Sequence, residues 1–244
     1  MEIKIFPNMA ETVQRLALDI SANITKTLLD REYFYIALSG GQTPRMLYET
    51  LALSPHKETI PWQRLHLFWG DERCVPLDHP QSNYLSAKKY LIDHTPVPAE
   101  NIHPINGGND PELEAVRYAR EIEEFLPAGS SGLPQFDLVL LGLGDDGHTA
   151  SLFPTGQDFF PDTSSICQVA EHPLSRQKRV SLTLQIINGA AQVVFLVSGA
   201  KKAPVVAEII GKKGEFATYP AAWVSPTPGQ LTWYLDRDAA HNLS

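Results

Sequence analysis

Residues 136–154 read FDLVLLGLGDDGHTASLFP, and this stretch decides which kind of α/β fold the chain adopts. An apolar, strand-like run passes directly into three glycines spaced G-x-G-x-x-G, the fingerprint of dinucleotide binding, in which a pyrophosphate lies on a helix N-terminus. Here Asp145 and Asp146 would repel a pyrophosphate, and Pro154 leaves a following helix little room. The turn also carries His148, and it therefore favours catalysis by side chains over dinucleotide binding.

Around this stretch, strand-like and helix-like apolar segments alternate along the chain. Strands are expected at residues 33–39, 65–70, 136–142, 166–170, 179–184, 191–198 and 231–236, the last at the edge of a sheet. Helices are expected at residues 10–30, 43–53, 82–93, 111–126 and 200–210. Such alternation is typical of a mainly parallel sheet with helices on both faces. We therefore predict a single α/β domain over residues 1–244.

The composition limits the classes of partner. The chain has 244 residues, 43% of them hydrophobic, and a net charge of −8. An acidic chain does not suit a nucleic-acid or anionic-membrane surface, although a local basic pocket for a small anion remains possible. Cys74 and Cys167 form no C-x-x-C pair, and no window approaches the roughly 18 apolar residues of a membrane span. We expect a cytoplasmic protein with neither a nucleic acid nor a membrane as partner.

Four glycine-bearing turns each follow an expected strand. They are SGG (residues 39–41), GDER (70–73), GLGDDGH (142–148) and SGAKK (198–202). In a parallel sheet the carboxyl ends of the strands meet at one edge, and ligands bind outside that edge. The four turns are therefore expected to meet there.

The first of these turns continues as SGGQTP, residues 39–44. A strand, two glycines and a helix start can place the backbone N–H groups of Gly40 and Gly41 around an anion, with help from the helix dipole. The G-K-[ST] ending of a Walker loop is missing. An ordinary tight turn with Thr43 as the helix cap explains these residues equally well, so both interpretations stay open.

Cations accompany several of the turns. Those at expected strand ends are Arg73, Arg179, Lys201 and Lys202. A phosphate monoester needs about two cations together with backbone donors, and arginine can bind it through two parallel hydrogen bonds. Each of these cations, considered alone, is also explained as a solvated surface charge. Their shared position at the ends of expected strands favours phosphate binding only moderately.

His148 stands beside Asp145 and Asp146, and Asp71 and Glu72 follow another strand. A neutral imidazole can take a proton from water and return it, and an adjacent carboxylate would orient the ring. A structural histidine in a turn is the alternative. No H-E-x-x-H or G-x-S-x-G pattern occurs, so neither a metal site nor a serine nucleophile is expected. The residues predict a metal-free α/β enzyme that uses histidine acid/base catalysis on a small phosphorylated metabolite.

Three blocks, in order, resemble the 6-phosphogluconolactonase family: ALSGGQTPRMLY (37–48), FWGDERCVP (68–76) followed by SNY (82–84), and LLGLGDDGHTASLFP (140–154). RVSLT and SGAKKA extend the similarity, which spans most of the chain. The resemblance implies hydrolysis of 6-phospho-D-glucono-1,5-lactone to 6-phosphogluconate in the cytosol, without a nucleotide cofactor. It also implies the three-layer Rossmann-like sandwich of glucosamine-6-phosphate deaminase. A monomer is expected.

The resemblance also implies roles for particular residues. His148 would activate water, Asp146 would orient His148 or a substrate hydroxyl, and Arg73 or a backbone N–H of the glycine turns would stabilise the anionic oxygen. The residues implied to bind the substrate and its 6-phosphate are Gly40, Gly41, Thr43, Asp71, Arg179 and Lys202.

Three positions within these blocks need comment. Lys202 is favoured over Lys201 because the family's lysine directly precedes an alanine. Asp145 occupies a looser position of the histidine motif and receives no role. Gln42 replaces a hydroxyl residue that is common in the family, which leaves the backbone donors of the turn in place.

Two other interpretations of the same blocks stay open. The isomerase and deaminase branch of the fold carries a glutamate where this chain has Phe153, and a tyrosine where it has Arg73. Phenylalanine cannot exchange protons, so lactone hydrolysis is the better match. The second alternative is a sugar-phosphate-sensing transcription regulator. Its DNA-binding module has no room, because about nine residues precede the first expected helix.

Overall fold

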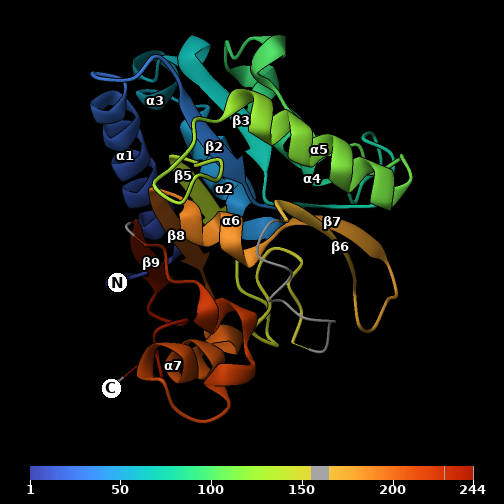
Figure 1. Cartoon of the computed structure of the whole chain (residues 1–244). Helices are drawn as coiled ribbons and strands as arrows, with labels where there is room; N and C mark the ends of the chain where they lie inside the picture. Colours follow the sequence, from blue (N-terminus) through green and yellow to red (C-terminus); the bar gives the residue numbers. More distant parts are fainter. Residues whose placement is uncertain (155–164, 228, 244) are drawn as a thin grey trace.

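The computed structural model describes residues 1–154, 165–227 and 229–243. Within them, six strands form one parallel sheet in the order β1-β9-β8-β5-β2-β3 (Figure 1). These strands are β1 (Glu2–Phe6), β2 (Phe34–Leu38), β3 (Leu65–Trp69), β5 (Leu138–Leu141), β8 (Gln192–Val197) and β9 (Gln230–Asp236). The expected mainly parallel sheet is confirmed.

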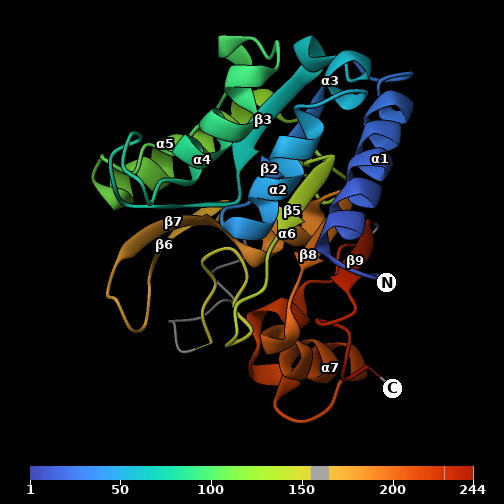
Figure 2. The same cartoon turned by 180° about the vertical axis from the view of Figure 1, so that it is seen from behind.

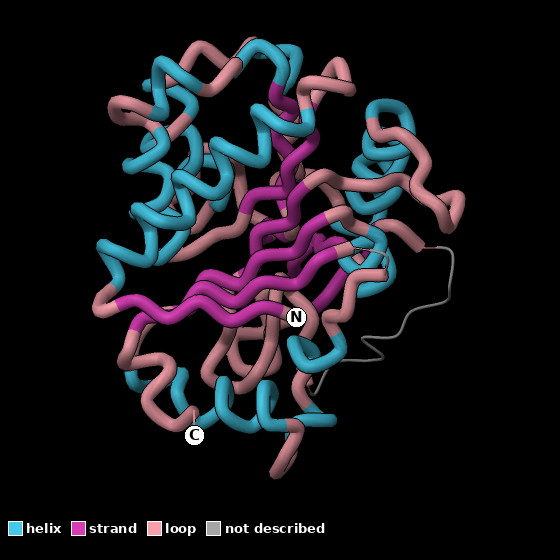
Figure 3. The backbone as a smooth tube through the Cα atoms, turned by 90° about the vertical axis from the view of Figure 1, so that its left-hand side faces the viewer, coloured by secondary structure: helices cyan, strands magenta, loops and turns pink. Residues whose placement is uncertain are grey.

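Helices lie on both sides of this sheet, as Figure 3 shows. They are α1 (Met9–Thr27), α2 (Gln42–Leu51), α3 (His56–Thr59), α4 (Asn83–Tyr90), α5 (Pro111–Phe125), α6 (Leu184–Gly189) and α7 (Ala203–Gly211). None of the helices in the described ranges is long and apolar enough to cross a membrane. The sheet and its two helical layers make the three-layer α/β sandwich that the sequence predicts.

A small antiparallel sheet lies beside the main one, with the ribbon of β6 and β7 prominent in Figure 2. Its order is β4-β7-β6. The strands are β4 (Asp71–Arg73), β6 (Cys167–Glu171) and β7 (Lys178–Leu182). The sequence predicts β6 and β7 as strands, but it does not predict that they leave the parallel sheet. They do so because β7 pairs with β4, which continues β3 beyond Gly70.

The edge of the main sheet differs from the expectation. Residues 231–236 are expected at the edge, and this is wrong, because β9 lies between β8 and β1. The edge strand is β1, for which the sequence analysis expects no strand; it pairs with β9 from Glu2↔Thr232 to Phe6↔Asp236. Ile3 and Ile5 of β1 are 37% and 50% exposed, so the strand carries little of the burial pattern that marks the others.

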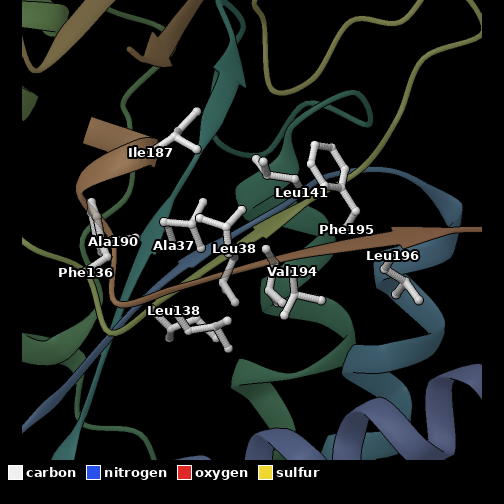
Figure 4. Close-up of a cluster of buried hydrophobic side chains, with 14 of the residues drawn as sticks. Ala37, Leu38, Phe136, Leu138, Leu141, Ile187, Ala190, Val194, Phe195 and Leu196 are labelled. Carbon is white, nitrogen blue, oxygen red and sulfur yellow. The ribbon is translucent and has the colours of Figure 1, made fainter. Parts of the chain in front are cut away.

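The centre of the core lies between β2, β5 and β8 (Figure 4). Side chains no more than 1% exposed there include Ala37, Leu38, Leu141, Val194 and Phe195. Every residue of β2 and β5 is buried, as expected for strands covered by helices on both faces. This packing holds the strands level, so their carboxyl ends form a common edge.

A chain of buried polar groups starts on β3. His66 is 5% exposed, its Nδ1 lies 2.9 Å from Nε2 of His103, and Nδ1 of His103 lies 2.9 Å from Oε1 of Glu121. Tyr33 and Tyr35 pack against the His66 ring. Burial, together with the neighbouring His103, lowers the pKa of His66 to about 4. The fold therefore favours the neutral form of this imidazole.

We expect the free energy of unfolding to fall as the pH is lowered from about 6.5 to about 4. Folding lowers the pKa of His66 from the ordinary 6.5 to about 4, so the unfolded chain takes up the proton first and is stabilised by it. Urea denaturation across this range measures the effect. His66→Phe should flatten the dependence, whereas His241→Gln, at an exposed position, should not. Equal slopes in the wild type and His66→Phe would contradict the assignment.

Candidate active site

A pocket of about 210 Å³ opens at the carboxyl edge of the sheet, where the four glycine-bearing turns meet as expected. Predicted site residues that line it are Gly40, Asp71, Arg73, His148, Arg179 and Lys202. Lining residues that the sequence analysis leaves without a role include Ser39, Asn83, Gly144 and Thr149. The pocket is many times larger than the roughly 10–15 Å³ that a single water needs by the same measure, so it suits a small metabolite.

His148 is held by Asp146. Its Nδ1 lies 2.5 Å from Oδ1 of Asp146, which also accepts a hydrogen bond of 3.2 Å from the backbone N–H of His148. Partial burial acts to raise the pKa of Asp146, but the hydrogen bonds and charge of His148 outweigh it and lower the pKa to about 2. An ionised carboxylate only accepts hydrogen bonds, so Nδ1 carries the proton. Nε2 of the neutral ring is then free to act as a base.

Two glycines allow the turn to take this shape. A Cβ at Gly144 would lie 2.1 Å from Nδ1 of His148 and 2.5 Å from Oδ1 of Asp146, so a side chain there would separate the pair. Gly147 has a φ of +78°, a backbone conformation that residues with a side chain rarely adopt. A Cβ there would also lie 2.4 Å from the ring of Tyr219. The G-x-G-x-x-G spacing therefore serves the histidine and its carboxylate.

Arg73 and Arg179 face the pocket from neighbouring strands. They are directly paired across β4 and β7, which places both side chains on one face of the small sheet. Nε of each is buried and has no hydrogen-bond partner within the described residues. Burial and the charge of Arg73 lower the pKa of Arg179, although Asp71 opposes them. Like charges placed opposite each other are unfavourable, so an anion bound between them would relieve the repulsion.

Asp71 connects these arginines to the histidine turn. Its buried Oδ2 accepts a hydrogen bond of 2.6 Å from Oγ of Ser151 and lies 3.8 Å from Nη1 of Arg179. Ser151 lies three residues beyond His148. Nδ2 of Asn83 donates to the backbone oxygen of Asp71 at 2.9 Å. Asp71 thus ties three segments of the pocket wall together as well as lining it.

Glu72 is an anchor to which the sequence analysis assigns no role. It is 1% exposed, and its carboxylate accepts hydrogen bonds of 2.8–2.9 Å from Oγ of Ser82 and from the backbone N–H groups of Arg73, Asn83 and Tyr84. Burial raises its pKa even though these hydrogen bonds oppose the rise. The carboxylate lies at the N-terminus of α4, where it satisfies free N–H groups and interacts favourably with the helix dipole. It therefore fixes the SNY segment beside DER.

The SGG turn passes close to α4. A Cβ at Gly40 would lie 1.9 Å from Oδ1 of Asn83, so only glycine fits there. Gly41, with a φ of +106°, precedes α2, which begins at Gln42 rather than at the expected Thr43. Thr43 therefore lies inside the first turn and is not the cap; it lines a separate depression beside the pocket. Gly40 alone of the turn's three predicted phosphate residues lines the main pocket.

The last turn supplies Lys202. After β8 the chain passes through Gly199, at a φ of +95°, into a short 3-10 turn (Ala200–Lys202). Lys202 lines the pocket, whereas Lys201 is exposed. Nζ of Lys202 lies 2.5 Å from Oδ1 of Asp145, a contact that the sequence analysis does not predict. It joins the turn after β8 to the turn after β5.

Phe153 buries one side of His148. It is 3% exposed, and its ring centroid lies 5.0 Å from that of His148 and 5.1 Å from that of His172. The guanidinium of Arg179 lies 5.7 Å from the same centroid. The position that carries a glutamate in the deaminase motif thus presents an apolar ring to the histidine and supplies no proton.

The pocket combines a histidine base with cationic groups. In the described parts of the chain, no group of three or more His, Cys, Asp and Glu side chains is placed to hold a metal ion. The acid/base group is His148, and the cations that face the same space are Arg73, Arg179 and Lys202. An arrangement of this kind can transfer a proton beside a small anion, and the α/β fold around it is that of an enzyme.

The chain belongs to the family described as glucosamine-6-phosphate isomerases/6-phosphogluconolactonase, whose model matches residues 7–233. The 6-phosphogluconolactonase of Haemophilus influenzae is 44% identical over 209 residues, which cover 86% of this chain and 87% of the relative. That of a Synechocystis species is 40% identical over 243 residues, covering 99% and 98%. The solved structure of 6-phosphogluconolactonase from Trypanosoma brucei matches with a TM-score of 0.86 at 29% identity, covering 100% of this chain and 98% of the other. The resemblance seen in the sequence is confirmed.

We expect Gly144→Ala to separate His148 from Asp146, because the added methyl group occupies the space of the imidazole. Nitrogen NMR of the histidine rings measures this, since the wild type should hold the proton on Nδ1 and the variant should lose that preference. Gly189→Ala is the control, because an added Cβ there meets no atom within 4 Å. An unchanged His148 signal in Gly144→Ala would show that the turn tolerates a side chain.

Proposed function

We propose that the chain hydrolyses 6-phospho-D-glucono-1,5-lactone to 6-phosphogluconate, the second step of the oxidative pentose phosphate pathway. The observation that carries the proposal is the ring of His148, in one pocket with Arg73 and Arg179. Asp146 engages its Nδ1, and no residue that the structure describes hydrogen-bonds to its Nε2. The lactonase names of the relatives with the highest identities reported above support this choice of substrate.

In the proposed mechanism, Nε2 of His148 takes a proton from a water molecule as the water oxygen attacks C1 of the lactone. Negative charge develops on the carbonyl oxygen, and Arg73 or a backbone N–H of the glycine turns stabilises it. The imidazolium then gives its proton to the ring oxygen as the bond from C1 to that oxygen breaks. Asp146, whose pKa is about 2, stays ionised throughout and stabilises the imidazolium. Asp71 lines the pocket and accepts a hydrogen bond from a substrate hydroxyl.

The 6-phosphate is the anion that the cations of the pocket would bind. A phosphate monoester carries between one and two negative charges near pH 7, roughly −1.5 to −2. Arg179 and Lys202 balance this charge, and the backbone N–H groups of Gly40 and Gly41 add donors. Thr43 lines a separate depression and not this pocket, so it is left out of the proposed phosphate site. The phosphate and the reacting carbon then lie at opposite ends of one small molecule.

The deaminase reaction of the same family is the alternative. Aldose–ketose isomerisation moves a proton between C1 and C2, and ring opening needs a further acid. The buried ring of Phe153 occupies the place of that acid. Lactone hydrolysis needs water activation, stabilisation of the oxyanion and protonation of the leaving oxygen, and side chains of the pocket can supply all three.

We also propose that the enzyme works as a monomer in the cytoplasm, with a sugar phosphate lactone as its partner and no cofactor. Every step of the proposed mechanism uses side chains and backbone groups of one chain. Neither a nucleic acid nor a membrane surface matches the acidic net charge of −8.

A pH-stat assay on freshly prepared lactone, run beside an ammonia assay on glucosamine 6-phosphate, tests the reaction. We expect acid release well above the spontaneous rate and no ammonia. His148→Ala should lower kcat about 10²–10⁴-fold, the usual contribution of a positioned general base. A His148→Ala variant that keeps the wild-type rate would remove His148 from the mechanism. Ammonia release without excess acid would replace the lactonase assignment with the deaminase one.

We expect Arg179→Ala and Lys202→Ala each to weaken binding of the phosphorylated lactone by about 1.5–3 kcal/mol, because each removes a charged hydrogen bond. Steady-state KM values measure this, with Lys201→Ala as the control for the neighbouring lysine, which is exposed. Unphosphorylated gluconolactone should be a poor substrate of the wild type. If the wild type used both lactones equally well, the anion site would be wrongly assigned.

A further inference from the structure

Asp145 contacts the lysine that the proposed function assigns to the phosphate. Nζ of Lys202 lies 2.5 Å from Oδ1 of Asp145, and the two side chains are 23% and 63% exposed. Asp145 directly precedes Asp146, but the two carboxylates of this turn engage different partners. Asp146 engages His148, and Asp145 engages Lys202.

The ion pair is not needed to hold the turn. The N–H of Gly144 donates to the oxygen of His148 at 2.8 Å, and that of Gly147 donates to the oxygen of Gly144 at 3.1 Å. The N–H of Ala221 donates to the oxygen of Gly147 at 3.1 Å and fixes the turn from outside. An ion pair with one partner this exposed adds little to the stability of a fold. Its consequence is at the pocket, which Lys202 lines.

We propose that Asp145 is a built-in counter-ion that competes with a phosphate monoester for Lys202 and thereby sets the affinity of the site for phosphorylated ligands. The inference rests on the proposed function, which places the 6-phosphate at Lys202. Asp145 already neutralises the charge of Lys202 and takes one of its donors, so a phosphate must share the lysine with this carboxylate or displace it. In either case the carboxylate stays on the same turn, where its charge repels the phosphate. Neither effect acts on a ligand without a phosphate.

Competition between Asp145 and the phosphate for Lys202 favours turnover, because it keeps the product from binding too tightly. Arg73 and Arg179 already present buried Nε atoms without a partner among the described residues, and a free Lys202 would add a third cation to the same pocket. Substrate and product both carry the phosphate, so a site in which Lys202 had no counter-ion would also hold the product more tightly. Because release of product limits many enzymes, a weaker phosphate site favours turnover.

Coulomb's law gives the size of the effect. A single charge about 6 Å from a dianion in water changes the affinity by about tenfold, and salt reduces this. Asp145→Asn removes the charge and keeps the shape. We expect Kd for inorganic phosphate, measured by calorimetry at low salt, to fall by about three- to tenfold. KM for the phosphorylated lactone should fall by a similar factor, with kcat changing less.

Three comparisons make the test specific. Asp30→Asn removes the same charge at an exposed position before β2, at the opposite edge of the sheet, and should change neither constant. KM for unphosphorylated gluconolactone should be the same in the wild type and Asp145→Asn. In a Lys202→Met background, Asp145→Asn should have a smaller effect on phosphate affinity than in the wild type.

The outcomes distinguish the proposed phosphate site at Lys202 from the proposed competition by Asp145. If Lys202→Met weakens phosphate binding but Asp145→Asn leaves it unchanged, Asp145 is not a competitor. If Asp145→Asn weakens phosphate binding, the carboxylate positions Lys202 for its ligand, and competition is wrong. If Lys202→Met itself leaves phosphate binding unchanged, the phosphate does not bind there, and the inference fails together with that part of the proposed function.

Discussion

The parallel pairing of β2 with β3 and β5, and of β5 with β8, is the constraint on which the site depends. The last paired residues are Leu38↔Trp69 for β2 and β3 and Leu141↔Phe195 for β5 and β8, and β8 continues two residues further, to Val197. Because the strands are parallel and end close to one another, turns that are far apart in the sequence open into one pocket. The strands themselves are buried and almost wholly apolar, so the charged groups of the site come from the turns after them and from β4 and β7 of the small sheet. The register of the parallel strands therefore also determines which turns meet at the site.

The charged groups of the pocket divide into those that hold the structure and those left for a ligand. Glu72 uses its carboxylate to hold the start of α4, and Asp71 uses one oxygen to hold Ser151. Arg73 and Arg179, by contrast, face each other across two strands with buried Nε atoms that no described residue satisfies. Donors fixed in this way before a ligand arrives need little rearrangement when charge appears beside them.

Much of this organisation could be predicted from the sequence. The apolar runs of β2, β3, β5 and β8 identify buried parallel strands, and the glycines after them identify the edge at which a ligand binds. His148 and Asp146 are close in sequence, so their pairing is a local property of the turn. The histidine motif also identifies the family from the sequence alone, because the residues that characterise the motif are adjacent in the chain.

Other features depend on contacts between distant segments, which a single sequence does not reveal. The ion pair of Asp145 with Lys202 and the contact of Asn83 with Gly40 join separate turns. β6 and β7 were recognisable as strands, but their partner β4 is three residues long and carries no periodicity. The sequence does not predict β1, because an edge strand is half exposed and lacks a clear burial pattern. Without that partner, β9 has the appearance of an edge strand. Helix α2 starts one residue early because Gly41, rather than a hydroxyl side chain, takes the capping position.

The pairing of β1 with β9 limits when this edge of the sheet can form during synthesis of the chain. Residues 2–6 are synthesised long before residues 232–236, which are their partners in the sheet. The first strand must therefore remain without its ladder until β9 has been synthesised. β2 can pair with β3 and β5 earlier, because both of these strands are synthesised well before β9. The half of the sheet that supports the SGG, DER and histidine turns is thus able to assemble before the edge is closed, and during synthesis the edge of β9 is the last surface to be covered.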